Sequence, residues 1–149
     1  MFATSTLLLS MHTAARHLVF HAAVILLFGL LLGAPYAKAI KRNAPAHIVN
    51  SWRVAHLSLP IGATLMLATA AVLTLLAVSA PAMWVIAIAL IVSGYGFCVS
   101  TPLAAITGQR GLSSGGAGLG KLVYAGNMVG AWGSIVGAIA LLSAAFVAL

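Results

Sequence analysis

The sequence predicts an all-α integral membrane protein, a four-helix bundle, from three observations. Hydrophobic residues make up 63% of the 149 residues and charged residues only 5%, whereas roughly a quarter of a soluble domain is charged. Four apolar runs are each long enough to cross a hydrocarbon core ~30 Å thick. The cations flank these runs. We therefore expect one domain, residues 1–149, with spans at about 17–34, 54–78, 84–106 and 122–147.

The charge balance excludes several classes of function. There are seven Lys and Arg residues and no Asp or Glu. Thinly spread cations beside apolar runs predict contact with anionic lipid and no nucleic-acid partner. Without carboxylates the chain cannot supply an acid–base pair, a Ser-His-Asp triad, a carboxylate proton relay or an acid-based Ca²⁺ or Mg²⁺ site. The single cysteine, Cys98, excludes an internal disulfide and a thiolate cluster.

The first span carries two histidines and a pair of small residues. His17 and His21 are four residues apart and therefore share one helical face. They are either a metal pair or, more simply, two polar side chains near the interface that bond to backbone or water. Gly29 and Gly33 have the small-xxx-small spacing of close helix contacts.

Prolines and cations mark the connections. Residues 35–53 contain four cations and the helix breakers Pro35 and Pro45, which predicts a polar loop over this range. Residues 80–82 predict a tight turn without charge. Tyr95 lies in the more polar second half of the third span and needs a partner for its hydroxyl.

Glycines dominate the last third of the chain. Residues 108–121 are glycine-rich, but Leu122 replaces the Ser or Thr of a phosphate loop and the preceding element is a membrane helix, so we do not expect a phosphate loop here. The last span has a stripe of small residues on one face, which predicts tight helix packing. The stripe consists of Gly126, Gly130, Gly133 and Gly137. Asn127, next to the stripe, is a candidate for an interhelical hydrogen bond.

The distribution of cations predicts the orientation. Six of the seven lie in the loops after the first and third spans, so the positive-inside rule places those loops in the cytoplasm and both termini outside. The expected location is a bacterial inner membrane. His17 and His21 then enter ~20–25 Å from His56, and a bis-His site joining His17 to His56 is not expected.

The candidate site is centred on Trp52-Arg53-Val54-Ala55-His56, where the second span begins. Trp52 and Arg53 are typical interfacial anchors, and His56 lies about one helical turn deeper at ~1.5 Å per residue. Pro60, four residues on, opens the backbone ladder near this histidine. The simpler alternatives are a plain structural histidine and an ordinary helix kink.

A neutral imidazole binds metals, yet a Zn²⁺ site needs three or four ligands and we find only His56 at this depth. Haem suits the pattern better, because it needs an imidazole for its iron, an apolar slot between helices and cations for its propionates. The candidate cofactor ligands are His56 for the iron and Arg53, Arg110 and Lys121 for the propionates.

Three patches resemble the styrene oxide isomerase family of small four-helix membrane proteins. They are His17 followed by Leu26-Leu27-Phe28-Gly29, Trp52-x-x-Ala55-His56, and Arg110-Gly111-Leu112 with the glycine-rich segment. Length, number of spans and order of the patches agree over most of the chain. The resemblance implies a trimeric haem b protein whose ferric iron acts as a Lewis acid on an epoxide oxygen and yields an aldehyde or ketone by a 1,2-shift.

The resemblance also assigns roles. His56 matches the axial histidine, Gly62 stands where the family has a pocket asparagine, and Tyr95 is the nearest candidate for the family's pocket tyrosine. Tyr95 and Asn127 are the candidate catalytic residues. The expected partners are an apolar epoxide, membrane lipid and further copies of the chain. The alternatives are a non-catalytic haem sensor or electron-transfer protein, and a haem-free small transporter or assembly subunit.

Overall fold

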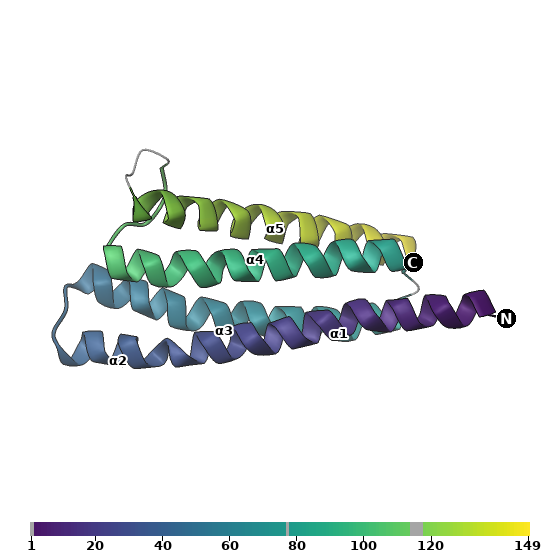
Figure 1. Cartoon of the computed structure of the whole chain (residues 1–149), viewed down its shortest axis with the longest axis horizontal. Helices are drawn as coiled ribbons and strands as arrows, with labels where there is room; N and C mark the ends of the chain where they lie inside the picture. The colour runs from purple at the N-terminus through teal and green to yellow at the C-terminus, as the bar shows by residue number, and fades with distance from the viewer. Residues whose placement is uncertain (1, 77, 114–117) are drawn as a thin grey trace.

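The chain forms a bundle of four long apolar helices (Figure 1). This computed structural model describes residues 2–76, 78–113 and 118–149, with side chains from residue 13 onward. The helices are α1 (Phe2–Leu31), α2 (Gly33–Lys41), α3 (Ala46–Leu75), α4 (Ala80–Thr107) and α5 (Leu119–Val147). Because α2 continues α1 after a turn at Leu32, Thr13–Lys41 forms the first of four candidate membrane spans. The predicted all-α membrane bundle is confirmed.

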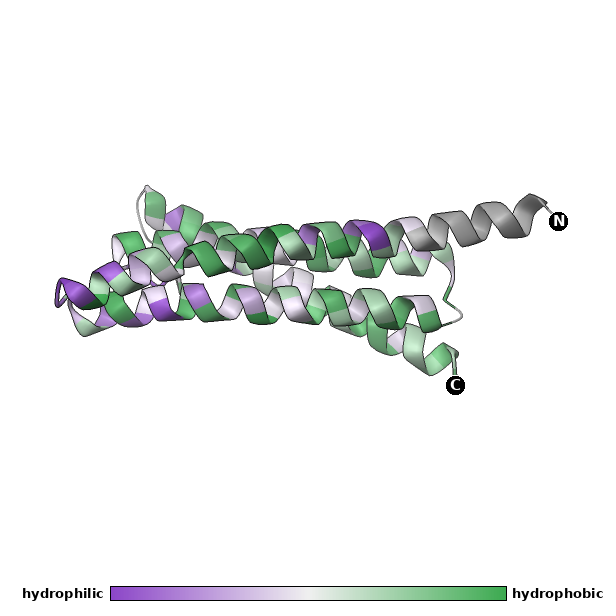
Figure 2. Ribbon diagram, turned by 90° about the horizontal axis from the view of Figure 1, so that it is seen from below, coloured by the Kyte–Doolittle hydropathy of each residue, from purple (hydrophilic) through white to green (hydrophobic). Residues whose placement is uncertain are grey.

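The helix surfaces are those of membrane spans. Large apolar side chains such as Leu27, Leu65 and Trp132 are more than 60% exposed, and apolar residues predominate along the coloured parts of the long helices (Figure 2). A helix that is apolar on all sides is typical of a lipid environment. The two cation-bearing connections lie at one end of the bundle and both termini at the other (Figure 1), as the predicted topology requires.

The polar loop predicted over residues 35–53 is wrong. Residues 33–41 form α2 and α3 already begins at Ala46, so only residues 42–45 connect them. Pro35 lies in the first turn of α2 and Pro45 directly precedes α3, and at helix starts a missing N–H costs little because those groups lack intrahelical acceptors. Asn43 closes the connection with a φ of 51°, a conformation that asparagine tolerates.

The tight turn predicted over residues 80–82 is also wrong. Helix α4 begins at Ala80, and Pro81 lies within its first turn, preceded by Ser79 in an extended conformation. Proline is favoured in the first turn of a helix because its fixed φ is already helical.

Helix α4 is the centre of the bundle, since it contacts α1, α3 and α5. Within the described ranges, α5 contacts only α4, and α1 packs on both α3 and α4. The predicted glycine stripe is confirmed as the α5 face that touches α4. A Cβ added at Gly130 would lie 2.8 Å from the Phe97 ring, and one added at Gly96 would lie 2.8 Å from the Gly130 backbone nitrogen.

The α1–α3 contact also depends on glycine. A Cβ at Gly29 would lie 2.6 Å from Cδ of Pro60 and 2.8 Å from Cβ of Leu59. The two backbones therefore approach closely where α3 carries its proline. This contact determines the position of the neighbouring histidine.

Candidate functional site

His56 points from α3 toward the junction of α1 and α2. Its Nδ1 lies 2.9 Å from the carbonyl oxygen of Gly29. The ring lies against Gly33, where an added Cβ would lie 3.0 Å from Cε1 of His56. The Tyr36 ring flanks it with a centroid separation of 6.1 Å and a tilt of 31°. The absence of a side chain at Gly33 therefore makes room for this half-buried imidazole.

Pro60 contributes to the same arrangement. It has no backbone N–H, so it cannot donate the usual helical hydrogen bond to the carbonyl of His56, four residues earlier. Its ring packs against Gly29, whose carbonyl oxygen binds the imidazole. One proline thus shapes both the backbone at His56 and the surface of α1 that orients the ring.

The hydrogen bond fixes the chemistry of the ring. A carbonyl oxygen only accepts, so Nδ1 carries the proton and donates, which leaves the lone pair of Nε2 available to a metal. Nε2 has no hydrogen-bond partner among the described residues. Within the same residues, no group of three or more His, Cys, Asp or Glu side chains could hold a metal ion. A single oriented imidazole fits haem iron better than a free Zn²⁺ ion.

The predicted propionate partners belong to different parts of the chain. Arg53 precedes His56 by three residues on α3 and donates to Oδ1 of Asn50 at 2.6 Å. Arg110 follows α4, and Lys121 is exposed in the first turn of α5. Arg53 lies near the start of α3, and the other two flank the connection between α4 and α5. These parts of the chain lie at the same end of the bundle (Figure 1), but only Arg53 belongs to the helix that carries His56.

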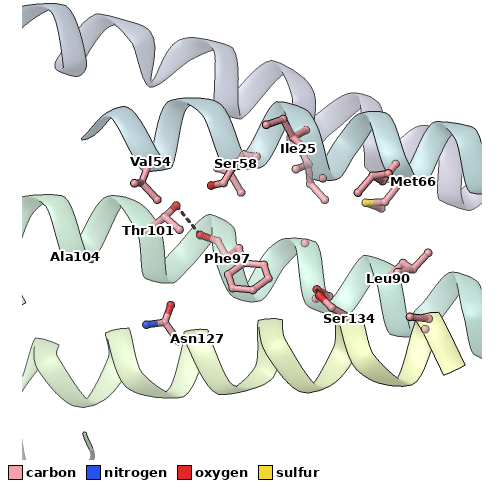
Figure 3. A pocket seen from close by; sticks show the side chains of 18 of the residues that line it. Ile25, Val54, Ser58, Met66, Leu90, Phe97, Thr101, Ala104, Asn127 and Ser134 are labelled. Carbon is pink, nitrogen blue, oxygen red and sulfur yellow. Dashed lines mark hydrogen bonds between the residues drawn. The ribbon is translucent and has the colours of Figure 1, made fainter. Parts of the chain in front are cut away.

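A groove of about 900 Å³ runs between α3 and α5, with α4 as its floor (Figure 3). It exists because α3 and α5 both pack on α4 and not on each other in the described part of the chain. Polar residues line the end near the cationic connections, and mostly apolar residues line the remainder. The polar end comprises Asn50, Ser51, Arg110 and Asn127, and the apolar part includes Val54, Leu59, Ile61, Leu65, Met66, Leu90, Phe97 and Leu141.

The groove and His56 occupy opposite faces of α3. Ser58, Gly62 and Leu65 line the groove, whereas His56 does not. At ~100° per residue, positions 56 and 58 project about 160° apart around the helix. The histidine and the groove therefore do not form one pocket within a single protomer.

Asn127 does not make the predicted interhelical hydrogen bond. Its Nδ2 donates to the carbonyl oxygens of Arg110 at 3.1 Å and Gly111 at 3.4 Å, in the connection that follows α4. The side chain ties this connection to α5 and lines the polar end of the groove. Residues 114–117 of the glycine-rich segment lie outside the described residues.

Tyr95 lies on the side of α4 that faces α1, away from the groove. Its hydroxyl is 2.8 Å from Nδ1 of His21, and the two rings meet edge to face at 5.6 Å. His17 stacks on His21 at 6.2 Å and contacts Trp84 at 5.4 Å, so the predicted shared face is confirmed. The need for a Tyr95 partner was predicted from the sequence, but the partner itself was not.

The two histidine groups remain apart. His56 bonds to Gly29, and His17 precedes Gly29 by twelve residues, or ~18 Å along a helix. A bis-His site joining His17 to His56 is thus incompatible with the fold. The sequence did not predict the contacts of His56 with Gly29, Gly33 and Tyr36, although the spacing of the two glycines indicated a close approach between helices.

These features define a small helical membrane protein with one oriented imidazole on one face and an apolar groove on the other. A family model described as styrene oxide isomerase (SOI) matches residues 14–146. The chain belongs to the styrene oxide isomerase family. No curated protein and no solved structure matches the chain. Membership in this family indicates an epoxide isomerase.

Proposed function

We propose that the protein is a haem b-dependent membrane enzyme that isomerises an epoxide to an aldehyde or ketone. Family membership supports the reaction. The observation that supports haem as the cofactor is the orientation of the His56 imidazole. Its Nδ1 is bound to the Gly29 carbonyl, and its Nε2 has no partner among the described residues. A ferric haem, when bound, supplies the Lewis acid for the epoxide oxygen.

The residues around His56 have distinct roles in this proposal. His56 holds the iron, the Gly29 carbonyl orients the ring, and Gly33 leaves space for it. Arg53, about one turn nearer the cationic end, can neutralise a propionate. Lys121 lies in the first turn of α5, so we assign any role of it at a propionate to a neighbouring protomer. Arg110 lines the polar end of the groove, where it can bind an anionic group of whichever ligand the groove holds.

Opening an epoxide leaves a carbon with cationic character that must be protected from water. The groove is lined mainly by aliphatic side chains and Phe97, and such a site excludes water. Asn127 at its polar end is one proposed catalytic residue. Tyr95 is bonded to His21 on the α1 side of α4, away from the groove of its own protomer, so its proposed catalytic role requires the groove of a neighbouring protomer. The rearrangement needs no general base, which suits a chain without Asp or Glu.

The opposite placement of His56 and the groove supports a homo-oligomer. One protomer presents its groove on the face of α3 that its own His56 does not share. A complete site would therefore combine the histidine of one copy with the groove of another. A trimer, as the family resemblance implies, provides such contacts in a closed ring.

The first test is an absorption spectrum. We would express the protein with haem precursor, purify it in detergent, and compare the wild type with His56→Ala and the control His47→Ala, which changes an exposed histidine nine residues away. We expect a near-stoichiometric Soret band in the wild type and the control and its loss in His56→Ala. Stoichiometric haem together with epoxide turnover in His56→Ala would contradict the assignment.

Gly33 offers a second test of the same site. In Gly33→Leu the new side chain must occupy the space of the His56 ring, because even its Cβ would lie 3.0 Å from Cε1. We expect haem content to fall about tenfold, since displacing an axial ligand by about an ångström removes its bond. The matched control is Ala68→Leu, an exposed position of α3 outside the groove. Equal haem in both variants would show that Gly33 does not shape the site.

One alternative has specific support. Gly62 stands at the position of the family's pocket asparagine, which favours a haem sensor or electron-transfer protein without isomerase activity. Such a protein would show a reversible spectral change with dithionite and no turnover of styrene oxide. A colourless preparation would instead leave the haem-free transporter or assembly subunit.

A further inference from the structure

We infer that the groove takes a long-chain epoxide with an anionic end, and that Gly62 is the residue that admits the chain. This inference rests on the proposed function and deepens it by naming the class of substrate. Three observations carry it: the length of the groove, the polar groups at one of its ends, and the empty space in front of Gly62.

The groove is long. Its lining on α3 extends from Asn50 to Thr69, which are nineteen residues apart, or ~28 Å along the helix. This approaches the ~30 Å thickness of the hydrocarbon core. A volume of about 900 Å³ lies near the upper end of small-molecule sites, which span roughly 300–1,000 Å³. A compact aryl epoxide would leave most of this length unfilled, whereas an extended chain would cover it.

The groove changes from polar to apolar along its length. Arg110 lines the polar end, and its guanidinium has no partner among the described residues. The chain has no Asp or Glu, so a negative charge for Arg110 must come from a ligand or a lipid. A carboxylate at the end of the substrate would satisfy it, because Arg binds carboxylates in a bidentate manner.

Beyond the polar end, most hydroxyls in the wall already donate to backbone carbonyls, and Ser58 is the exception among the described residues. Ser93 and Ser134 both donate to the carbonyl oxygen of Gly130, at 2.7 and 2.9 Å, and Thr101 donates to that of Phe97 at 2.8 Å (Figure 3). These residues therefore present mainly carbon to the groove. A hydrocarbon chain fits this surface without displacing a hydrogen bond.

Gly62 differs from the glycines that join helices. Added Cβ atoms at Gly29, Gly96 and Gly130 would overlap a neighbouring helix, but at Gly62 no atom lies within 4 Å. Glycine inside a helix costs roughly 0.5–1 kcal/mol relative to alanine, and no packing contact explains that cost here. The position of Gly62 in the groove wall explains the absence of a side chain, because a larger residue would project into the path of the ligand.

The chemistry is a balanced isomerisation. One C–O bond of the epoxide breaks, a hydride moves from the oxygen-bearing carbon to the neighbouring carbon, and the remaining C–O bond becomes the carbonyl of a ketone. No oxidant, reductant or second substrate is consumed.

The test compares two kinds of epoxide in the haem-loaded protein in lipid nanodiscs. The substrates are styrene oxide, the epoxide of oleic acid and the methyl ester of that epoxide. We expect kcat/KM for the oleic acid epoxide to exceed that for styrene oxide by about tenfold or more, since each buried methylene adds binding energy. Arg110→Gln should remove the preference for the acid over the ester.

Substitutions on α3 test Gly62 directly. Gly62→Leu should lower the ratio of kcat/KM for the long-chain epoxide to that for styrene oxide by about tenfold, with a smaller drop in Gly62→Ala. The matched control is Ala68→Leu, which adds side-chain bulk at an exposed position of α3 outside the groove and should leave the ratio unchanged. Circular dichroism confirms that each variant is folded.

A binding assay separates the two levels of proposal. Fluorescence of cis-parinaric acid, a long-chain carboxylate, should rise on binding to the wild type and much less with Gly62→Leu or Arg110→Gln. One result would overturn the inference and leave the isomerase function intact. In that result the wild type turns over styrene oxide efficiently, and Gly62→Leu changes neither the turnover of the long-chain epoxide nor the binding of parinarate. If no epoxide were turned over, the isomerase proposal would fail, and parinarate binding would still decide whether the groove accepts this ligand class.

Discussion

A comparison of two alanine substitutions tests the central packing contact of the bundle. Gly96 of α4 and Gly62 of α3 are both glycines inside long helices. Alanine at either position gains the same intrinsic helix preference, ~1 kcal/mol. The difference between the two variants therefore isolates the contact that each new methyl group makes.

The magnitude follows from the geometry. At Gly96 the methyl carbon would lie 2.8 Å from the backbone nitrogen of Gly130 and 2.9 Å from the backbone oxygen of Gly126. Ordinary contact distances are about 3.5 Å or more, so α4 and α5 must separate locally by ~0.7 Å. Overpacking of this kind costs ~1–3 kcal/mol. At Gly62 there is nothing to displace within 4 Å, and Gly62→Ala should be neutral or stabilising.

The assay is reversible unfolding in mixed micelles of a mild detergent and sodium dodecyl sulfate, followed by circular dichroism. We expect Gly96→Ala to lower the free energy of unfolding by ~1–3 kcal/mol relative to Gly62→Ala. A difference below ~0.5 kcal/mol would refute the close approach of α4 and α5, because contact energies on this scale exceed the usual error of additivity.

Two further substitutions test side-chain hydrogen bonds. Asn127→Ala leaves the loop carbonyls at 110 and 111 without their donor and should destabilise the protein by ~1 kcal/mol, with faster proteolysis in the 108–118 connection; unchanged proteolysis would show that Asn127 does not hold it. Tyr95→Phe removes the bond to His21 and should cost about 0.6 kcal/mol, at most ~1.7. Tyr124→Phe, whose hydroxyl has no partner among the described residues, is its control, and equal losses would place the Tyr95 bond in doubt.

Hydropathy predicted the four long helices because a membrane span needs length and apolar composition, both of which are local properties of the sequence. The boundaries were less accurate. Pro35, Pro45 and Pro81 were interpreted as breaks, yet each lies at or next to the start of a helix. Proline is compatible with those positions, and a sequence pattern alone does not show whether a proline ends one helix or begins the next.

The site was predicted in part. The pattern ending at His56 identified the imidazole, since its depth follows from its distance to Arg53 along one helix. Its partners, the carbonyl of Gly29 and the ring of Tyr36, come from helices that are distant in the sequence. The carbonyl is a backbone group and leaves no side-chain signal. Asn127 shows the same limit, because the glycine stripe predicted which face of α5 packs on α4 but not that the amide bonds to the preceding loop.

The single attachment of α5 has a consequence for biogenesis. During synthesis the first three long helices can complete their mutual contacts before α5 leaves the ribosome, because none of those contacts involves it in the described chain. Until then the face of α4 that carries Ser93 and Ser100 has only lipid beside it. The arrival of α5 covers these hydroxyls and at the same moment supplies the second wall of the groove. The ligand-binding surface therefore matures only when the last helix has inserted, and a ribosome stalled before α5 emerges would hold a bundle without it.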